Sequence, residues 1–308
     1  MKVLLLDLDI SKRRRLFPNL ALMKLSAYHK KNGDDVYLNF PLRLPDITYA
    51  SSVFTWNRLR AEKEGRYPEG VIKGGVGFEW VSPEVYTPQW LADEVEHIMP
   101  DYSLYPKVDF SLGFTSRGCT RCCPWCIVPK KEGGLNPWAR LYEFWDRSHR
   151  KITLLDNNLL AAPNWKVTME DLLAEELEVD FNQGLDIRLL NEDNLYYLKR
   201  VKTHEFRFAF DDISQEKAIR KGIELLLDAG IRSRHLSFYL LHGFGNDDQI
   251  IERLAILHSY DVDIFPMAYR DFLGKEPPRR FLQVPDFLWH GNRGNINRLL
   301  RLVGRLPE

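Results

Sequence analysis

The chain has 308 residues, of which 44% are hydrophobic, enough apolar content for packed cores in about two domains. Lysine plus arginine and aspartate plus glutamate number 43 each, so no net charge draws the protein to nucleic acid or membrane. No charged-then-apolar leader opens the sequence, and no apolar run approaches membrane-spanning length. We therefore expect a cytoplasmic protein with no membrane partner.

Residues 1–105 predict a small α/β domain. A helix is expected over 20–31, where Asn32-Gly33 supplies a stop signal. Strands are expected at 3–8, 35–39, 47–55 and 71–75. Alternation of strands with a helix predicts a Rossmann-like parallel sheet with crossover connections.

Residues 106–274 predict a second α/β domain with a regular alternation. Strands are expected near 109–114, 151–156, 179–183, 205–210, 235–241 and 262–267. Helices are expected near 138–147, 167–178, 191–200, 214–229 and 246–259. The expected turn or cap residues are Asp180, Asn191, Asp212 or Ser214, and Asn246. Six such strands predict a partial (β/α)6 barrel, whose active site is expected where the strands end.

Residues 275–308 form a basic tail. It contains Pro277-Pro278 near its start, and the residues after these prolines are rich in arginine. Two readings stay open. The arginines form a solvated face, or they form a cap over the barrel mouth that contacts an anionic substrate such as a nucleotide or nucleic acid.

All four cysteines of the chain lie in one eight-residue segment, Cys119-Thr-Arg-Cys122-Cys123-Pro-Trp-Cys126. Cys119, Cys123 and Cys126 have C-x3-C-x2-C spacing, which suits three ligands of a 4Fe-4S cluster and leaves one iron open. Zinc would pair Cys119 with Cys122 and Cys123 with Cys126, but no spacer separates the two pairs. Cys122 is interpreted as a bystander rather than a redox or ligand-exchanging residue.

Trp125 directly precedes the last cysteine, and the segment follows the first expected barrel strand. This arrangement resembles the radical S-adenosylmethionine (SAM) superfamily. The resemblance implies the partial barrel, a 4Fe-4S cluster on Cys119, Cys123 and Cys126, and SAM bound at the open iron. It also implies a low-potential electron donor of the flavodoxin or ferredoxin type.

The same resemblance assigns SAM contacts to the ends of later strands. Glycine beside Gln, Asp and Arg suits a ribose and carboxylate site, because Arg can grip a carboxylate through two hydrogen bonds. The implied contacts are Asp156, Asn157, Asn158, Gln183, Asp186, Arg188, Gly243, Phe244 and Met267. The alternatives are a simple turn at 156–158, a surface pair of Asp186 with Arg188, and core filling by Met267. Arg207 is expected to point into the barrel, and His242 is interpreted as a packing residue rather than a proton donor.

The first domain resembles the cobalamin-binding domain that precedes many radical SAM barrels. The Asp-x-His-x-x-Gly pattern that supplies a histidine to cobalt is absent, because His29 lies four residues before Gly33 without a matching aspartate. Cobalamin is therefore possible but not favoured. Methylthiotransferases need three further cysteines in their first domain, and this chain has none there.

No catalytic residue and no substrate follow from these patterns. The leading hypothesis is a radical SAM enzyme that cleaves SAM reductively and modifies an anionic or nucleotide-like substrate. One alternative is an iron–sulfur or zinc module that binds nucleic acid without catalysis. Another is a radical SAM methyltransferase.

Overall fold

The computed structural model describes residues 1–308 except 11–16, 41–43, 88–90, 246–248 and 276–308. The expected cap Asn246 and the basic tail beyond Lys275 lie outside the described residues. None of the described helices is long and apolar enough to cross a membrane. The chain divides into two compact units, and we describe each by itself.

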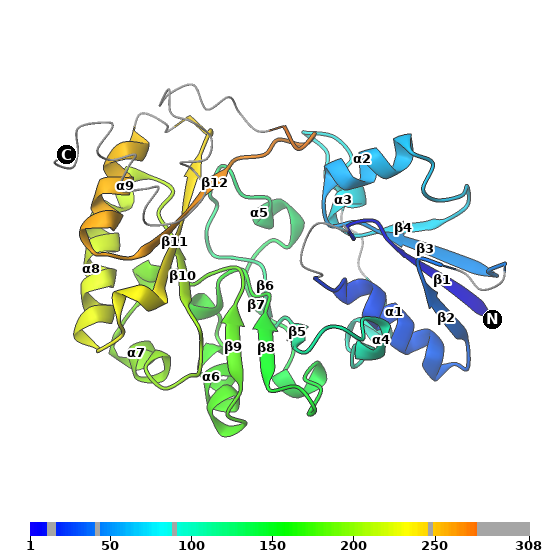
Figure 1. Ribbon diagram of the computed structural model, residues 1–308, viewed down its shortest axis with the longest axis horizontal. Helices are drawn as coiled ribbons and strands as arrows, with labels where there is room; N and C mark the ends of the chain where they lie inside the picture. The colour runs from blue at the N-terminus through cyan, green and yellow to red at the C-terminus, as the bar shows by residue number, and fades with distance from the viewer. Residues whose placement is uncertain (11–16, 41–43, 88–90, 246–248, 276–308) are drawn as a thin grey trace. The chain divides into compact units, whose positions relative to one another are not determined.

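The first unit comprises Met1–Gly113, Ala139–Arg150 and Asp271–Lys275. It holds a parallel four-stranded sheet in the order β2-β1-β3-β4 (Figure 1). The sheet strands are β1 (Lys2–Asp7), β2 (Asp35–Leu38), β3 (Ile47–Ser51) and β4 (Ile72–Gly74). Other elements are α1 (Leu20–Lys31), α2 (Thr55–Lys63), α3 (Val76–Glu79), α4 (Asp93–Glu96), η1 (Tyr102–Leu104), β5 (Ser111–Gly113) and η2 (Leu141–Glu143). The predicted Rossmann-like parallel sheet is confirmed.

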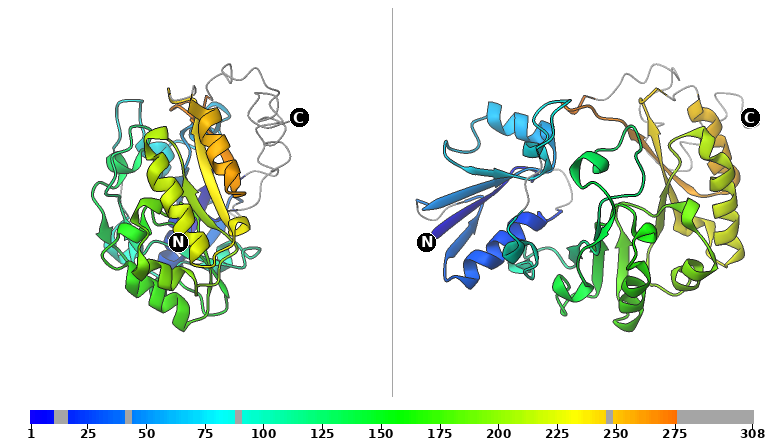
Figure 2. Two further views of the ribbon diagram at one scale, coloured as in Figure 1. Left: turned by 90° about the vertical axis from the view of Figure 1, so that its left-hand side faces the viewer. Right: turned by 180° about the vertical axis from the view of Figure 1, so that it is seen from behind.

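Helices cover both faces of this sheet because β1 is apolar on both sides. Val3 and Leu5 pack with Leu22 of α1 on one face. Leu4 and Leu6 pack on the other face with residues of α2 and α3. The views in Figure 2 show α1 and the pair α2–α3 on opposite sides of the sheet. A continuous apolar strand is typical of a parallel sheet buried on both faces.

One expected strand of this unit is too long in the sequence-based prediction. The strand predicted over 47–55 ends at Ser51, and α2 begins at Thr55. The carboxylate of Asp9 accepts hydrogen bonds from the backbone N–H of Val53 and from the Ser52 hydroxyl. These contacts take the backbone away from the sheet ladder and turn the chain into the helix.

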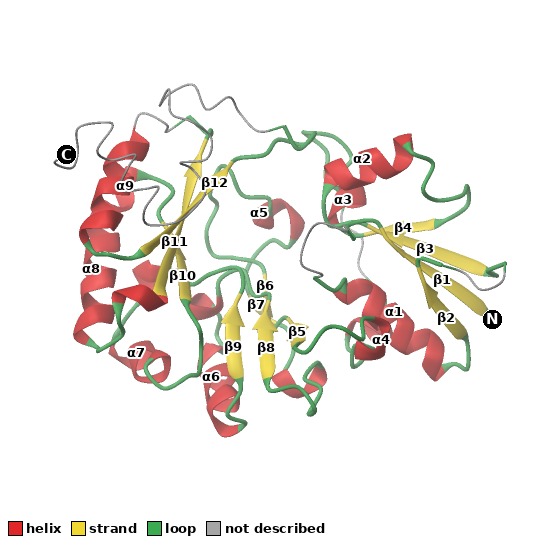
Figure 3. Cartoon of the chain, viewed as in Figure 1, coloured by secondary structure: helices red, strands yellow, loops and turns green. Residues whose placement is uncertain are grey.

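Among the described residues, the second unit comprises Phe114–Trp138 and Lys151–Arg270. Its strands are β6 (Ser116–Arg117), β7 (Asn136–Pro137), β8 (Lys151–Leu154), β9 (Glu178–Phe181), β10 (Phe206–Ala209), β11 (Leu236–His242) and β12 (Asp263–Ala268). Its helices are α5 (Val128–Lys131), η3 (Leu159–Ala161), α6 (Trp165–Ala174), η4 (Ile187–Leu189), α7 (Glu192–Leu198), η5 (Ile213–Gln215), α8 (Glu216–Asp228), η6 (Ser233–His235) and α9 (Ile250–Ser259). Strand and helix alternate as expected (Figure 3).

The strands of the second unit run parallel, apart from the short antiparallel pair β6–β7. β8 pairs with β9, and β11 lies between β10 and β12. The backbone N–H of Leu185 donates to the carbonyl of Arg207 at 2.7 Å, which joins the end of β9 to β10. The carboxyl ends of these strands therefore gather the loops that follow them.

The predicted helix over 138–147 is wrong, since these residues form only the single turn η2 before an aspartate turn. Pro137 ends β7, and the backbone N–H of Trp138 donates to Thr115 rather than starting a helix. Asp146 accepts from both the backbone N–H and the hydroxyl of Ser148, at 2.9 and 2.7 Å. Such local side-chain bonds compete with helical pairing.

In the second unit, the boundaries of some predicted elements differ by a few residues. The helix predicted over 167–178 ends at Ala174, because Glu176 has a left-handed backbone with φ of 51°. Asp180 is not a cap but the third residue of β9, where it forms an ion pair with Arg207. Asn191 caps α7 as expected, and Asp212 caps η5, which leads directly into α8.

Candidate functional site

The cysteine segment lies in a loop whose two ends are held together. β6 pairs with β7, and between them the backbone N–H of Cys119 donates to Gly133 at 3.4 Å. Gly118 has φ of 83°, and a Cβ placed on it would lie 2.1 Å from the carbonyl oxygen of Gly134. Only glycine fits this position, because any side chain would be strained and would clash. The close approach of the two ends of the loop therefore fixes the backbone position of Cys119.

Burial and neighbouring groups raise the pKa of two of the thiols in the C-x3-C-x2-C pattern. Partial desolvation raises the pKa of the Cys123 thiol, and the Cys119 thiol raises it further. Desolvation likewise raises the pKa of Cys126, with further contributions from Cys123 and Cys119. Cys122 and Cys126 are exposed, whereas Cys119 and Cys123 are partly buried. The assignment of Cys119, Cys123 and Cys126 as cluster ligands stays a prediction.

A preformed site for a single metal ion is not seen. Among the residues that the structure describes, no three His, Cys, Asp or Glu side chains are arranged to hold one ion. A four-thiol zinc site would require such convergence at one point. The thiolates of an iron–sulfur cluster bind different irons, so their sulfur atoms need not meet. The donor set of soft thiols fits the cluster.

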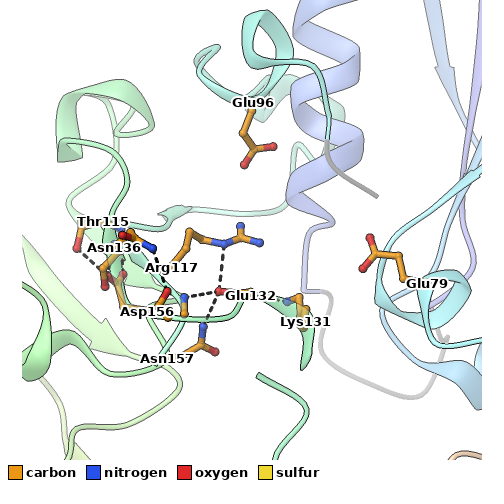
Figure 4. A network of polar contacts seen from close by, with 12 residues as sticks. Glu79, Glu96, Thr115, Arg117, Lys131, Glu132, Asn136, Asp156 and Asn157 are labelled. Carbon is orange, nitrogen blue, oxygen red and sulfur yellow. Dashed lines mark hydrogen bonds and ion pairs between the residues drawn. The ribbon is translucent and has the colours of Figure 1, made fainter. Parts of the chain in front are cut away.

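Asp156 holds the residues that lead into the cysteine loop through hydrogen bonds. Its buried carboxylate accepts four hydrogen bonds, from the backbone N–H and hydroxyl of Thr115 and of Ser116, at 2.6–3.0 Å (Figure 4). Burial raises the pKa of Asp156, whereas these hydrogen bonds lower it. Both carboxylate oxygens are engaged within the protein, and a contact of Asp156 with SAM stays a prediction.

Asn158 lies directly beside the cysteine loop. Its amide nitrogen is 3.6 Å from the Cys119 sulfur and 3.4 Å from an oxygen of Asp186. The residue is only 4% exposed, and its Oδ1 has no hydrogen-bond partner among the described residues. A buried amide oxygen without a donor is costly, so a hydrogen-bond donor such as a water molecule or a ligand N–H group would stabilise it.

Asp186 joins two arginines next to the same sulfur. Arg188 donates to both of its oxygens, at 2.6 and 3.0 Å, and Arg121 of the cysteine loop donates at 3.0 Å. Burial acts to raise the pKa of Asp186, but Arg188 and Arg121 outweigh it, so the pKa lies below its usual value. The predicted pair of Asp186 with Arg188 exists, and it is tied to the cysteine loop rather than isolated on the surface.

Three aromatic residues in contact with one another include Trp125 of the cysteine loop. The Trp125 ring meets Phe244 edge-on at 5.9 Å, and Phe244 meets Tyr269 at 4.7 Å. Trp125 also forms a side-chain hydrogen bond to Asp211, whose pKa is raised mainly by burial. Phe244, predicted from the glycine motif after β11, therefore reaches the cysteine segment.

The remaining predicted contacts are Asn157, Gln183, Gly243 and Met267. The Asn157 amide donates to Glu132 at 2.8 Å. Gln183 is exposed and donates to Asn182, and Gly243 follows β11 with φ of 86°. Met267 is 39% exposed on β12, so it is not core filler. Contacts of these residues with SAM stay predictions.

Arg207 and His242 both lie on strands of the second unit. Arg207 lies between the buried Phe206 and Phe208 on β10 and forms ion pairs with Asp180 and Glu205, and its expected direction into the barrel stays a prediction. This pairing offsets the cost that an isolated buried charge would carry. His242 is buried at the end of β11, which suits a packing residue.

Three residues near the thiols escaped the sequence-based prediction: Arg121, Glu132 and Asp211. Arg121 lies within the cysteine motif. The sequence gives no sign that it is more than a solvated charge, because its partner Asp186 is distant in the sequence. Glu132 follows two lysines in a polar loop, and Asp211 precedes a second aspartate that caps η5. The only available signal for Asp211 was its place at the end of an expected strand.

The fold of the chain, with its N-terminal Rossmann-like sheet, is similar to that of solved radical SAM structures, in agreement with the resemblance of the cysteine motif. It is similar to solved structures of TsrM, a radical SAM methyltransferase from Kitasatospora setae. The form with tryptophan substrate and a SAM analogue has a TM-score of 0.64 and 11% identity, over 89% of this chain and 75% of TsrM. The form with cobalamin and a [4Fe-4S] cluster has a TM-score of 0.65 and 12% identity, over 89% and 74%. Neither a family model nor a curated protein sequence matches the chain.

Proposed function

We propose that the protein is a radical SAM enzyme whose 4Fe-4S cluster is held by Cys119, Cys123 and Cys126. The observation that carries the proposal is the contact of the Asn158 amide with both the sulfur of Cys119 and the carboxylate of Asp186. The strand-end polar groups distinguish an enzyme from a cluster-bearing nucleic-acid module. A binding module would not need a buried, unsatisfied amide next to a cluster ligand.

The residues around Cys119 fit SAM. The unpartnered Oδ1 of Asn158 can accept a hydrogen bond from the amino group of SAM. Arg121 and Arg188 supply guanidinium groups that can engage its carboxylate. The aromatic rings of Phe244 and Trp125 offer apolar surface for the adenine. The cluster, when bound, supplies one electron for reductive cleavage of SAM to methionine and a 5′-deoxyadenosyl radical, which abstracts hydrogen from the substrate.

The protein's part in this chemistry is to bind, orient and exclude water. Asp186 holds Arg121 and Arg188 in fixed directions, so less side-chain entropy is lost when they bind an anion. Amide groups close to sulfur, the Arg121 N–H at 3.3 Å and the Asn158 amide, tune the reduction potential of a cluster. The electron comes from a low-potential flavodoxin- or ferredoxin-type donor. An anionic, nucleotide-like substrate remains the hypothesis suggested by the basic tail.

Methyl transfer is a second candidate, favoured by the likeness of fold to a radical SAM methyltransferase over 89% of this chain. A cobalamin held by a protein histidine does not fit His29. That ring is buried and bonded to Asp34 at 2.7 Å and Tyr49 at 3.1 Å. Loading with cobalamin, followed by its visible spectrum after gel filtration, decides whether cobalamin binds without such a ligand.

Anaerobic reconstitution with iron and sulfide tests the proposed function. The reconstituted protein is expected to absorb broadly near about 400 nm, where sulfide-to-iron charge transfer falls. Dithionite and SAM should then yield 5′-deoxyadenosine, detected by chromatography. A cluster-loaded protein that forms no 5′-deoxyadenosine would argue for the nucleic-acid module instead.

A further inference from the structure

Glu132 lies at the centre of a polar network beneath the cysteine loop. Its side chain is fully buried although it follows two lysines. One carboxylate oxygen accepts from the backbone N–H of Gly118 and from the amide of Asn157, each at 2.8 Å. Figure 4 shows Arg117 and Asn157 converging on this carboxylate.

Two cations keep this carboxylate ionised. Nε of Arg117 lies 3.2 Å from one oxygen, and Nζ of Lys131 lies 2.9 Å from the other. Burial acts to raise the pKa of Glu132, but Lys131 and Arg117 bring it below its usual value. Arg117 is itself fixed between the rings of Phe114 and Trp138, at 4.1 and 5.5 Å from their centroids.

The partners of Glu132 come from both sides of the predicted site. Gly118 directly precedes Cys119, so its N–H sets the direction in which the cysteine loop leaves β6. Asn157 directly precedes Asn158, whose amide lies against the Cys119 sulfur. A single carboxylate therefore ties the backbone before the first thiol to the segment before the unpartnered amide.

We propose that Glu132 is a positioning residue that locks the cysteine loop against the segment after β8, so that Cys119 and Asn158 are held in register before any cofactor binds. Glu132 is not one of the predicted cluster ligands, and it acts through Gly118 and Asn157. The inference rests on the proposed function for its consequence, but the lock itself is a property of the protein alone.

Hydrogen–deuterium exchange of the full-length protein without iron tests the lock directly. The Gly118 amide, in a peptide spanning about residues 115–126, should be protected in the wild type. Glu132→Ala should speed its exchange by roughly tenfold, the equivalent of one lost hydrogen bond. Glu132→Gln keeps an acceptor oxygen and should retain most of this protection. Lys130→Ala, an exposed neighbour, is the matched control and should change nothing.

Fast exchange of Gly118 in the wild type, or unchanged exchange in folded Glu132→Ala, would overturn the proposal. The wild-type measurement keeps the test decisive if the alanine variant fails to fold.

The second readout is the spectroscopic response of the reduced cluster to SAM. In Glu132→Ala the SAM-induced change in the electron paramagnetic resonance spectrum should require roughly tenfold more SAM, while Glu132→Gln restores it towards wild type. A wild type that takes up no iron refutes the proposed function and leaves the exchange result standing. A wild type that responds to SAM alongside an unaltered Glu132→Ala refutes the positioning role alone.

Discussion

The side-chain amide nitrogen of Asn158 lies 3.6 Å from the sulfur of Cys119, although 39 residues separate them in the chain. The same amide approaches Asp186 at 3.4 Å, while its oxygen has no partner among the described residues. Asn158 thus joins a predicted cluster ligand to a predicted SAM contact through its amide nitrogen.

Asn158→Ala should weaken SAM binding without removing the cluster. The variant loses an acceptor for the amino group of SAM, and affinity should fall by about 5- to 150-fold, equivalent to 1–3 kcal/mol. The measurement is anaerobic calorimetry on cluster-loaded protein. Asn136→Ala, an exposed amide on β7, is the control and should bind SAM as the wild type does. Equal affinities for the two variants would rule out this contact.

Asp186→Ala should also leave the iron content intact, because Asp186 is not a ligand. Without it Arg121 and Arg188 lose their shared anchor, and the SAM carboxylate must order them itself. Affinity for SAM should therefore fall by about 5- to 150-fold, and Arg188→Ala should act in the same direction. If both variants bind SAM normally, the pair is structural and the SAM pocket lies elsewhere.

The first unit should become less stable as the pH rises through 6. Burial raises the pKa of Asp7 to about 6, and the nearby Asp9 adds to this effect, while the Tyr105 hydroxyl opposes it. A raised carboxyl pKa favours the folded protein at low pH, and this contribution of up to ~3 kcal/mol is lost between about pH 4 and 6.

Urea unfolding of Asp7→Asn and wild type, compared at pH 4 and pH 8, measures this contribution. The variant should gain stability relative to wild type at the higher pH, because asparagine carries no charge into the core. Asp35→Asn, on the exposed start of β2, is the control. The same pH dependence in Asp7→Asn as in wild type would show that Asp7 ionises without cost.

Local patterns were enough to predict most of the fold. The helix over 20–31 matches its prediction residue for residue, because an asparagine cap and Asn32-Gly33 mark its ends. The prediction failed at 138–147, where Asp146 bonds its own neighbour Ser148 and where Trp138 donates to Thr115, a partner distant in sequence. Whether such a segment forms a helix depends on hydrogen-bond partners that the local sequence does not reveal.

One short segment carries most of the information that the sequence holds about the site. The cysteine spacing selects three of the four thiols as cluster ligands, and this assignment stays a prediction. Nothing in the sequence distinguishes Arg121, Glu132 and Asp211 from other charged residues. Their place in the site depends on partners 14 to 65 residues away or on burial. Charge patterns along the chain do not encode such pairings.

The central claim is that Cys119, Cys123 and Cys126, and not Cys122, hold a 4Fe-4S cluster. Iron and sulfide are measured after anaerobic reconstitution of the wild type and of the four single cysteine-to-alanine variants. The account predicts four irons per chain, from the cluster stoichiometry, in the wild type and in Cys122→Ala, with loss of the cluster and of 5′-deoxyadenosine formation in the other three. One tightly bound zinc and no iron in the anaerobically purified protein, lost equally in all four variants, would contradict it.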